Sequence, residues 1–274
     1  MSEDELNHLC YELRKKIVKM NYLSGTGHIT SSCSCLEILV ALYFGGVLKY
    51  DSHKPLWTER DYFLISKGHA ALAVYSVLSE AGFFPEEDLW TFCQIGSKYG
   101  GHPNLRIPGV ESTSGSLGHG LSIASGIALG TKLNNGKNRI FCLTGDGELQ
   151  EGSNWEAALA ISHFNMDNFT WIIDRNKLQI AGETEEIIRL EDLSNKLTSF
   201  GFDVKIVDGH DVKKLVEVLS GSSNKPLAII ANTIKGKGIP FLENKRGWHG
   251  RKPNNEELGV ILKELSMTEE DLKK

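Results

Sequence analysis

The sequence of 274 residues contains no apolar run that approaches the length needed to span a bilayer. Its first ten residues, MSEDELNHLC, lack the apolar core of a signal peptide. It also lacks an excess of basic residues, because 30 Lys and Arg are outnumbered by 35 Asp and Glu and are scattered along the chain. A net charge of −5 without a basic stripe argues against a nucleic-acid surface. We therefore expect a cytoplasmic protein that binds neither membranes nor nucleic acid.

The chain also lacks a cysteine framework. Its cysteines are odd in number and widely spread: Cys10, Cys33, Cys35, Cys93 and Cys142. Such a set favours reduced thiols, and Cys33-x-Cys35 has no second pair at the spacing of a zinc site. Internal repeats, low-complexity segments and linkers are absent as well, so we expect one domain over residues 1–274.

What the chain does contain is two short apolar segments that each end in polar residues. Residues 140–144 (IFCLT) are followed by Gly-Asp-Gly (145–147), and residues 169–173 (FTWII) are followed by Asp-Arg-Asn (174–176). Short apolar runs that stop at a turn are typical of buried parallel strands. The carboxyl ends of parallel strands share one edge of a sheet, where open α/β folds bind ligands. We therefore expect both polar segments at one site.

The residue types at this edge suit a divalent cation. Asp146 and Asn176 offer hard oxygen ligands for Mg²⁺ (or Ca²⁺), and the carbonyl of Leu178 offers a third, which leaves positions for phosphate oxygens and water. Gly145 and Gly147 let the backbone approach a ligand, and the following helix N-terminus favours an anion. Gly-Asp-Gly alone occurs in many turns. However, Asn176 follows Asp146 by thirty residues, about one strand–helix–strand unit, so both side chains can reach one ion.

Strand and helix patterns alternate along the chain and predict an α/β fold with a doubly wound, mostly parallel sheet flanked by helices. We expect strands at residues 61–66, 140–144, 169–173, 204–207 and 227–231. We expect helices at residues 4–23, 35–44, 71–80, 86–92, 121–133, 191–200, 212–219 and 254–265, and a further helix after residue 147. Glu151 should lie one turn into that further helix, residues 25–32 should form a loop, and residues 267–274 a charged tail.

Four histidines each lie in a glycine-containing loop between regular elements: His28, His69, His102 and His249. One such histidine would mean little, since His69 could merely cap the helix that follows it. Four histidines together with the Asp146 and Asn176 pair fit a site that handles protons and hydroxyl groups around a bound cofactor.

The Gly-Asp-Gly of residues 145–147, followed thirty residues later by Asn176, resembles the motif of thiamine diphosphate (ThDP)-dependent enzymes. The segments GDGELQEGSNWEA and NKLQI, and Gly-Trp-His-Gly at 247–250, resemble transketolases in particular. The resemblance implies the ThDP-binding fold of the PP type, with the metal held by Asp146, Asn176 and the carbonyl of Leu178. The cofactor contacts that it implies are His69, Gly115, Ser116, Leu117, Gly145, Asp146, Gly147, Glu151, Asn176, Ile180, Ile234 and His249.

The resemblance also implies the reaction, which is transfer of a two-carbon ketol unit from a ketose phosphate to an aldose phosphate in pentose phosphate chemistry. His28, His69, His102 and His249 would act as catalytic residues, in contact with the donor oxygens and the diphosphate. Glu151 would act with them, within a carboxylate network at a subunit interface.

The resemblance covers only the first part of a transketolase, because nothing here resembles the second domain of the family. We therefore expect the N-terminal subunit of a split transketolase, active only with a separate C-terminal subunit in an α₂β₂ heterotetramer. Three alternatives stay open: a deoxyxylulose-phosphate synthase-like subunit, a 2-oxo acid dehydrogenase-like subunit, and a non-catalytic ThDP-binding module.

Overall fold

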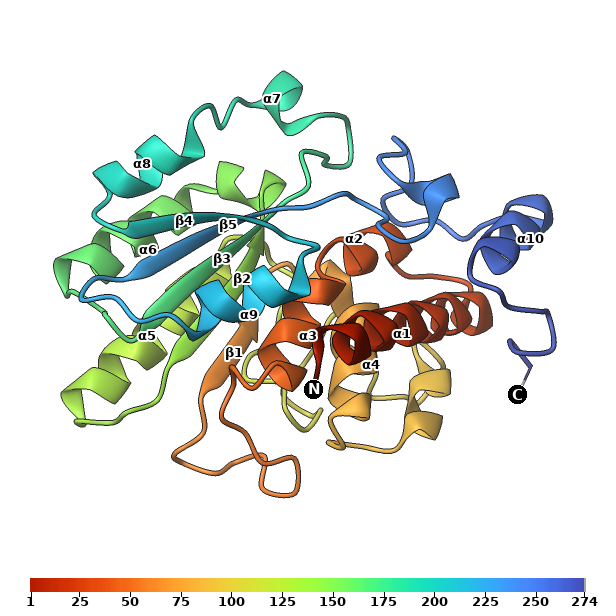
Figure 1. Ribbon diagram of the computed structural model, residues 1–274, viewed down its shortest axis with the longest axis horizontal. Helices are drawn as coiled ribbons and strands as arrows, with labels where there is room; N and C mark the ends of the chain where they lie inside the picture. The colour runs from red at the N-terminus through yellow and green to blue at the C-terminus, as the bar shows by residue number, and fades with distance from the viewer. Residues whose placement is uncertain (274) are drawn as a thin grey trace.

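The computed structural model describes residues 1–273, in which a five-stranded sheet lies between two layers of helices (Figure 1). The expected domain end at residue 274 lies outside the described residues. All strand pairs are parallel, in the order β1-β2-β3-β5-β4. The strands are β1 (Tyr62–Ile65), β2 (Ile140–Gly145), β3 (Phe169–Arg175), β4 (Asp203–Asp208) and β5 (Leu227–Asn232). The prediction of a doubly wound parallel sheet is confirmed.

The long helices cover both faces of the sheet (Figure 1). One face is covered by α1 (Glu3–Ser24), α3 (Leu36–Phe44), α4 (Ala71–Glu80) and α9 (Val212–Ser220). The other is covered by α5 (His119–Leu133), α6 (Gly152–His163) and α8 (Leu193–Ser199). The remaining helices are α2 (Ile29–Ser34), α7 (Thr184–Ile187) and α10 (Asn255–Glu264), and 3₁₀ helices at Gly68–Ala70, Glu86–Thr91, Gly147–Gln150 and Pro240–Leu242.

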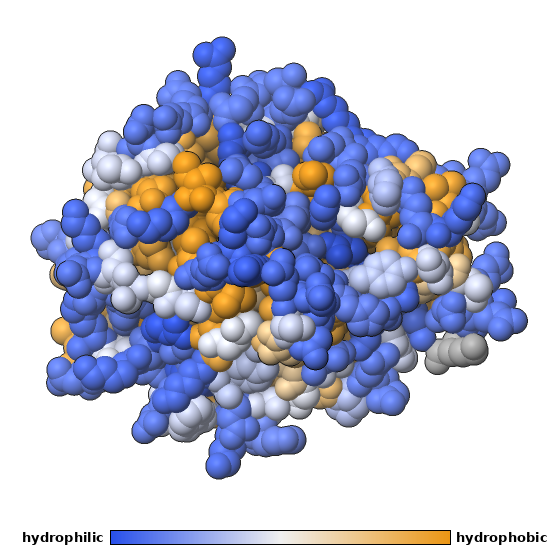
Figure 2. Space-filling model, viewed as in Figure 1, coloured by the Kyte–Doolittle hydropathy of each residue, from blue (hydrophilic) through white to orange (hydrophobic). Residues whose placement is uncertain are grey.

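The central strands are mostly apolar up to their carboxyl ends because helices cover both of their faces. Along β2, Phe141 and Leu143 join the core under α1, α3 and α4, whereas Ile140 and Cys142 join the core under α5 and α6. Successive side chains of a strand point to opposite faces, so a run without polar alternation is what a doubly covered strand requires. The surface on the face drawn in Figure 1 is mostly hydrophilic, with apolar patches (Figure 2).

Two local expectations are wrong. Residues 29–34 form α2 instead of a loop, because their small side chains are buried and the segment packs against α4. Glu151 directly precedes α6 and is not one turn inside it, because the chain first forms a 3₁₀ helix and Asn154 Nδ2 donates to the Glu148 carbonyl at 2.7 Å. Within the expected charged tail, Leu272 is buried beside α10.

The strand register brings the loops that carry polar residues to one edge of the sheet. Gly145 at the end of β2 pairs with Asp174 of β3, and Arg175 at the end of β3 pairs with Asn232 at the end of β5. Asp208, the last residue of β4, pairs with Asn232 too. The loops after these strands therefore start side by side. Among residues 1–273, no helix is long and apolar enough to cross a membrane.

Candidate active site

A cavity of about 350 Å³ opens at the carboxyl edge of the sheet. It is lined by the loops that follow β1, β2, β3 and β5 and by the segments around His28, His102 and His249. The lining residues are His28, Ser31, Lys67, His69, His102, Gly115, Leu117, Gly145, Asp146, Gly147, Glu148, Gln150, Asn176, Leu178, Gln179, Ile180, Ala181, Lys235 and His249. The structure thus brings all four predicted histidines together with the three predicted metal ligands.

Asp146 lies against the peptide that follows Asn176. Its Oδ2 accepts from the Lys177 amide at 2.5 Å and from Arg175 Nη1 at 3.0 Å, and its Oδ1 accepts from the Gly147 amide at 2.7 Å. Lys177 has a φ of 65°, a left-handed turn that directs its amide at the carboxylate. Asn176 Oδ1 accepts from the Leu178 amide at 3.1 Å. The carboxylate, the amide oxygen and the Leu178 peptide are therefore clustered.

The surroundings of the buried Asp146 carboxyl disfavour its ionised form, which a bound cation would stabilise. Burial, and next the Asp174 carboxylate, raise its pKa to about 6. The Arg175 guanidinium and the amides of Lys177 and Gly147 lower the pKa, but by less than the other two causes raise it. A metal ion at this point would favour the ionised form. Residues 1–273 hold no group of three His, Cys, Asp or Glu side chains that could bind a metal. A cation here would have to take amide and carbonyl oxygens as well, a donor set that suits Mg²⁺ better than zinc.

The four histidines form one cluster around His28. The centroid of its ring lies 5.0 Å from His249, 5.5 Å from His69 and 6.4 Å from His102, and the rings of His69 and His249 are 5.1 Å apart. Burial, and then neighbouring positive groups, lower the pKa of His28 to about 4 and of His249 to about 3. The pKa of His69 is also far below its usual value, mainly through burial. These three rings are therefore neutral near pH 7 and can both donate and accept a proton.

Two lysines line the cavity and differ in their partners. Lys67 is fully buried and forms an ion pair with Asp174, which raises its pKa although burial alone would lower it. Lys235 Nζ instead lies 3.3 Å from the Leu178 carbonyl and 3.3 Å from His249 Nδ1. Burial, and next Lys67, lower its pKa to about 8, so it is mostly charged at pH 7. Its ammonium contacts a carbonyl and an imidazole rather than a carboxylate, which suits an anionic ligand.

Two buried polar atoms of the lining have no hydrogen-bond partner within the described part of the chain. They are His28 Nδ1 and Ser31 Oγ. Buried polar groups are normally hydrogen-bonded. The cavity thus presents oxygen ligands for a cation, the Lys235 ammonium and unsatisfied polar atoms, a combination that fits a metal-bound diphosphate such as that of ThDP.

The structure spreads the other predicted contacts over several places. Gly115, Leu117 and Ile180 lie in the cavity lining. Ser116 and Glu151 are exposed and lie outside it, and Ile234 lines a second cavity next to the first. Their cofactor contacts stay predictions.

Seven residues of the cavity lining were not predicted as site residues from the sequence: Ser31, Lys67, Glu148, Gln150, Gln179, Ala181 and Lys235. Glu148 is buried, hydrogen-bonds Ser66, and accepts from the amides of Gly118 at 2.9 Å and Gly145 at 3.1 Å. An acidic residue directly after Gly-Asp-Gly, and a lysine between a strand end and His69, were the available signals. Lys235 belongs to a basic, glycine-rich loop that could equally have been a solvated surface.

Comparison with known proteins identifies the family of the chain. The family model described as "Transketolase, thiamine diphosphate binding domain" matches residues 14–272. The chain is 43% identical over 269 residues to one of the subunits of the apulose-4-phosphate transketolase of Actinobacillus succinogenes, with 97% of each chain covered. It is 39% identical to 6-deoxy-6-sulfo-D-fructose transketolase subunit SqwG of a Clostridium species, with 97% of this chain and 98% of that one covered.

Solved structures agree with this result. The transketolase of Campylobacter jejuni superimposes with a TM-score of 0.91 at 29% identity, over 100% of this chain and 46% of that one. The chain therefore spans less than half of the length of that transketolase chain. The predictions of the family, the ThDP-binding α/β fold and a transketolase-type enzyme are confirmed. The chain belongs to the transketolase family, in which it corresponds to the thiamine diphosphate-binding domain.

Proposed function

We propose that this chain is the N-terminal subunit of a two-subunit transketolase. With a separate C-terminal subunit it transfers a two-carbon ketol unit from a ketose phosphate to an aldose phosphate, using ThDP and Mg²⁺. The observation that carries the proposal is that one cavity unites the Asp146 and Asn176 oxygens, four histidines and Lys235. The relatives named as subunits support the split arrangement, because this chain covers almost all of their length.

In this proposal Asp146, Asn176 and the Leu178 carbonyl hold Mg²⁺, and Lys235, His69 and His249 face the diphosphate. Gly145 and Gly147 permit close approach of the backbone, and Gly115, Leu117 and Ile180 border the rest of the cofactor. When bound, ThDP supplies the electron sink that a two-carbon transfer needs, while the protein positions the substrates and transfers protons. Three of the four imidazoles have lowered pKa values and are neutral, which suits exchange of protons with substrate hydroxyl groups.

We propose an α₂β₂ assembly in which two copies of this chain meet through α5. Along this helix Ser122, Ile123, Gly126 and Leu133 are exposed, and a methyl group added at Gly126 would meet nothing within 4 Å. A bare helix face with small and apolar residues supports close packing against another chain. Glu151 lies beside Gly118 at the start of α5, which supports its proposed place in an interface carboxylate network.

We further propose that residues 1–274 form a single domain and that the enzyme is cytoplasmic. The core under α1, α3, α4 and α9 joins residues from Leu6 to Leu265, near both ends of the sequence, which supports one domain. The five cysteines are free, which supports a reducing compartment. We propose sugar phosphates of the pentose phosphate type as substrates. The names of the relatives, which refer to an apulose phosphate and a sulfonated fructose, show that substrates differ among such subunits.

Reconstitution tests the proposal. The chain and its C-terminal partner are purified separately, and ketol transfer between sugar phosphates is measured for each alone and for the mixture, with ThDP and Mg²⁺ present. We expect transfer only in the mixture, whose mass by light scattering should match two copies of each chain. Transfer by this chain alone would refute the split arrangement.

A further inference from the structure

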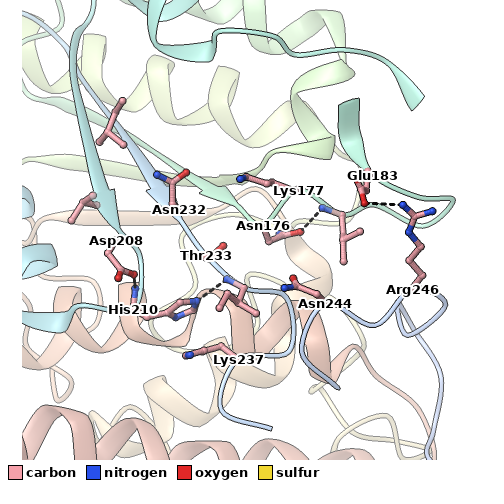
Figure 3. Close-up of a pocket in the computed structure, with 14 residues that line it drawn as sticks. Asn176, Lys177, Glu183, Asp208, His210, Asn232, Thr233, Lys237, Asn244 and Arg246 are labelled. Carbon is pink, nitrogen blue, oxygen red and sulfur yellow. Dashed lines mark hydrogen bonds and ion pairs between the residues drawn. The ribbon is translucent and has the colours of Figure 1, made fainter. Parts of the chain in front are cut away.

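The loop after β5, residues 233–238, carries Lys235 into the cavity but is held in place from outside it. Behind this loop lies a second cavity of about 750 Å³ at the ends of β3, β4 and β5 (Figure 3). His210, from the loop after β4, lies at its wall, and a hydrogen bond joins its ring to the 233–238 loop (Figure 3). Nothing in the proposed reaction uses His210.

His210 is the middle residue of a partly buried chain of polar contacts. Its Nε2 accepts from the Ile234 amide at 2.7 Å, and its Nδ1 lies 3.1 Å from Glu37 Oε2. The other oxygen of Glu37 is paired with Arg14, whose Nε donates to the Lys237 carbonyl at 2.8 Å. We call Arg14, Glu37 and His210 the clasp, because they hold the loop at residues on both sides of Lys235.

The clasp works only if the His210 ring is neutral. Because the ring accepts from Ile234 through Nε2, its single proton must be on Nδ1, where it is donated to Glu37. Burial, and next Lys237, lower the pKa of His210 to about 4, in agreement with a neutral ring. Glu37 is buried on α3 and needs both Arg14 and His210 as partners, which fixes the tautomer.

Other residues of the 233–238 loop are also held by hydrogen bonds and close packing. Thr233 hydrogen-bonds Asp174, and the Gly236 amide donates to the Thr30 carbonyl at 3.0 Å. Gly236 and Gly238 have φ values of 82° and 81°, and a methyl group at Gly238 would collide with the Arg14 side chain. The backbone around Lys235 is thus restrained by Asp174, Thr30 and Arg14 in addition to the two hydrogen bonds of the clasp.

We propose that Glu37 and His210 are positioning residues for cofactor binding, which act through the Ile234 amide to aim Lys235 at the diphosphate. The proposal rests on the proposed function, since it takes the cavity to be the ThDP site. The proposal states that the hydrogen-bond acceptor at the His210 Nε2 position fixes the conformation of the 233–238 loop, and that the volume of the ring does not.

Two substitutions separate these alternatives. His210→Gln places an amide oxygen near the Nε2 position and keeps an acceptor for Ile234. His210→Asn places its polar atoms near the Nδ1 position, so it keeps a contact to Glu37 and loses the acceptor. Both remove the ring, and Asn is shorter than Gln by one methylene group.

The first measurement needs no cofactor. Hydrogen–deuterium exchange of peptides that contain residues 233–238 is followed in the free chain for wild type and both variants. We expect faster exchange of the Ile234 amide in His210→Asn and near wild-type exchange in His210→Gln. Equal exchange in all three proteins, or equal acceleration in both variants, would overturn the proposal.

The second measurement is the dissociation constant of ThDP at saturating Mg²⁺ in the complex with the partner, by calorimetry. We expect a weakening of about fivefold to tenfold for His210→Asn, the effect of one hydrogen bond, and less than about twofold for His210→Gln. The turnover number at saturating ThDP should change less than the dissociation constant. Equal weakening in both variants would overturn the proposal.

Two controls complete the design. If wild type binds no ThDP, the proposed function fails, while the exchange data still decide whether the clasp sets the loop. If His210→Asn does not fold, Arg14→Lys takes its place, because it keeps a positive charge beside Glu37 and removes the bond to the Lys237 carbonyl. That variant should likewise accelerate exchange in residues 233–238 and weaken ThDP binding, and wild-type behaviour in both measurements would overturn the proposal.

Discussion

At the scale of single residues, Asp146 combines two roles. It lies at the sheet edge, as its position after β2 predicts, but it is buried and anchors the amides of Gly147 and Lys177. Complete removal of the side chain would leave Arg175 with only its half-buried partner Glu185 as an ion pair among the described residues. A test of the metal-binding role should therefore keep the shape of the residue.

We predict that Asp146→Asn weakens Mg²⁺-dependent ThDP binding by at least about 100-fold, since loss of residues that merely orient metal ligands already costs roughly 10–100-fold. The measurement is calorimetric titration of ThDP at fixed Mg²⁺. Asp167→Asn is the matched control, because Asp167 is exposed and lies outside the cavity. If the Asp146 variant holds ThDP as tightly as the control does, Asp146 is not a ligand.

The buried histidines predict loss of stability in acid. Burial lowers the pKa values of His28, His69, His210 and His249, so below pH 6.5 the unfolded chain binds more protons than the folded chain. Their contribution to stability is present above pH 6.5 and is lost as the pH falls toward about 4. The raised pKa values of two carboxyls act in the opposite direction, but the histidines outnumber them.

The measurement is urea unfolding of the cofactor-free chain at pH 7.5 and pH 5. We expect a lower midpoint at pH 5, and a smaller difference between the two pH values in His28→Gln, which removes one of the titrating rings. A midpoint that rises on acidification would show that the buried carboxyls dominate instead.

Individual site residues were predictable where two signals coincided. Asp146 and Asn176 each follow an apolar strand, and their thirty-residue spacing predicts proximity. Lys235 and Glu148 were not predictable as site residues, because their roles depend on groups from other loops. Lys235 hydrogen-bonds the Leu178 carbonyl, and Glu148 accepts from the Gly118 amide. Such contacts follow from tertiary packing, so the position of Glu148 after Gly-Asp-Gly and of Lys235 in a basic loop does not by itself reveal them.

At the scale of elements, α5 contains one glycine in close packing and another that faces open space. Gly120 packs on the end of β1, where an added methyl group would lie 2.7 Å from the Cα of Ser66. At Gly126 the same methyl group would meet nothing within 4 Å. The first glycine is required by close packing, and the second is not required within a single chain.

We predict opposite effects of alanine at these two positions. Gly120→Ala should destabilise the chain by about 1–3 kcal/mol, because backbone atoms at the end of β1 must move. Gly126→Ala should stabilise it by about 0.5–1 kcal/mol through helix propensity. Urea unfolding of the isolated chain compares the two variants with wild type, and the same sign of change in both would contradict this description of α5.

The regular elements were predictable because their patterns are local. Apolar runs bounded by turns predicted β1, β2, β3 and β5 to within a few residues, since a strand covered on both faces is mostly apolar. The edge strand β4 contains Lys205 and is partly exposed, but it too lies within a residue of its expected bounds. The segment 29–34 was not predictable, because Ser and Thr favour turns in isolation and form α2 here only through packing against α4. The start of α6 was misplaced for a similar reason, as the contact from Asn154 to the Glu148 carbonyl sets it.

At the scale of the whole molecule, the sheet order brings the site together at the ends of β1, β2, β3 and β5. The loop after β3 continues to α8 on one face, while the chain after β5 turns to the side of α1 and α2. Such divergence of neighbouring loops opens a crevice at the carboxyl edge of an open sheet. The crevice can hold the metal and the diphosphate, and in our proposal the partner subunit supplies the rest of the site.

The most direct test of the proposed site is the position of the metal in the assembled enzyme. Crystals of the complex are grown with ThDP and Mn²⁺ in place of Mg²⁺, and the ion is located by its anomalous scattering. We predict one peak per copy of this chain at about 2.1–2.2 Å from Asp146, Asn176 Oδ1 and the Leu178 carbonyl. A complex that contains ThDP but has its ion elsewhere, or an ion that lacks either Asp146 or Asn176 as a ligand, would contradict this assignment.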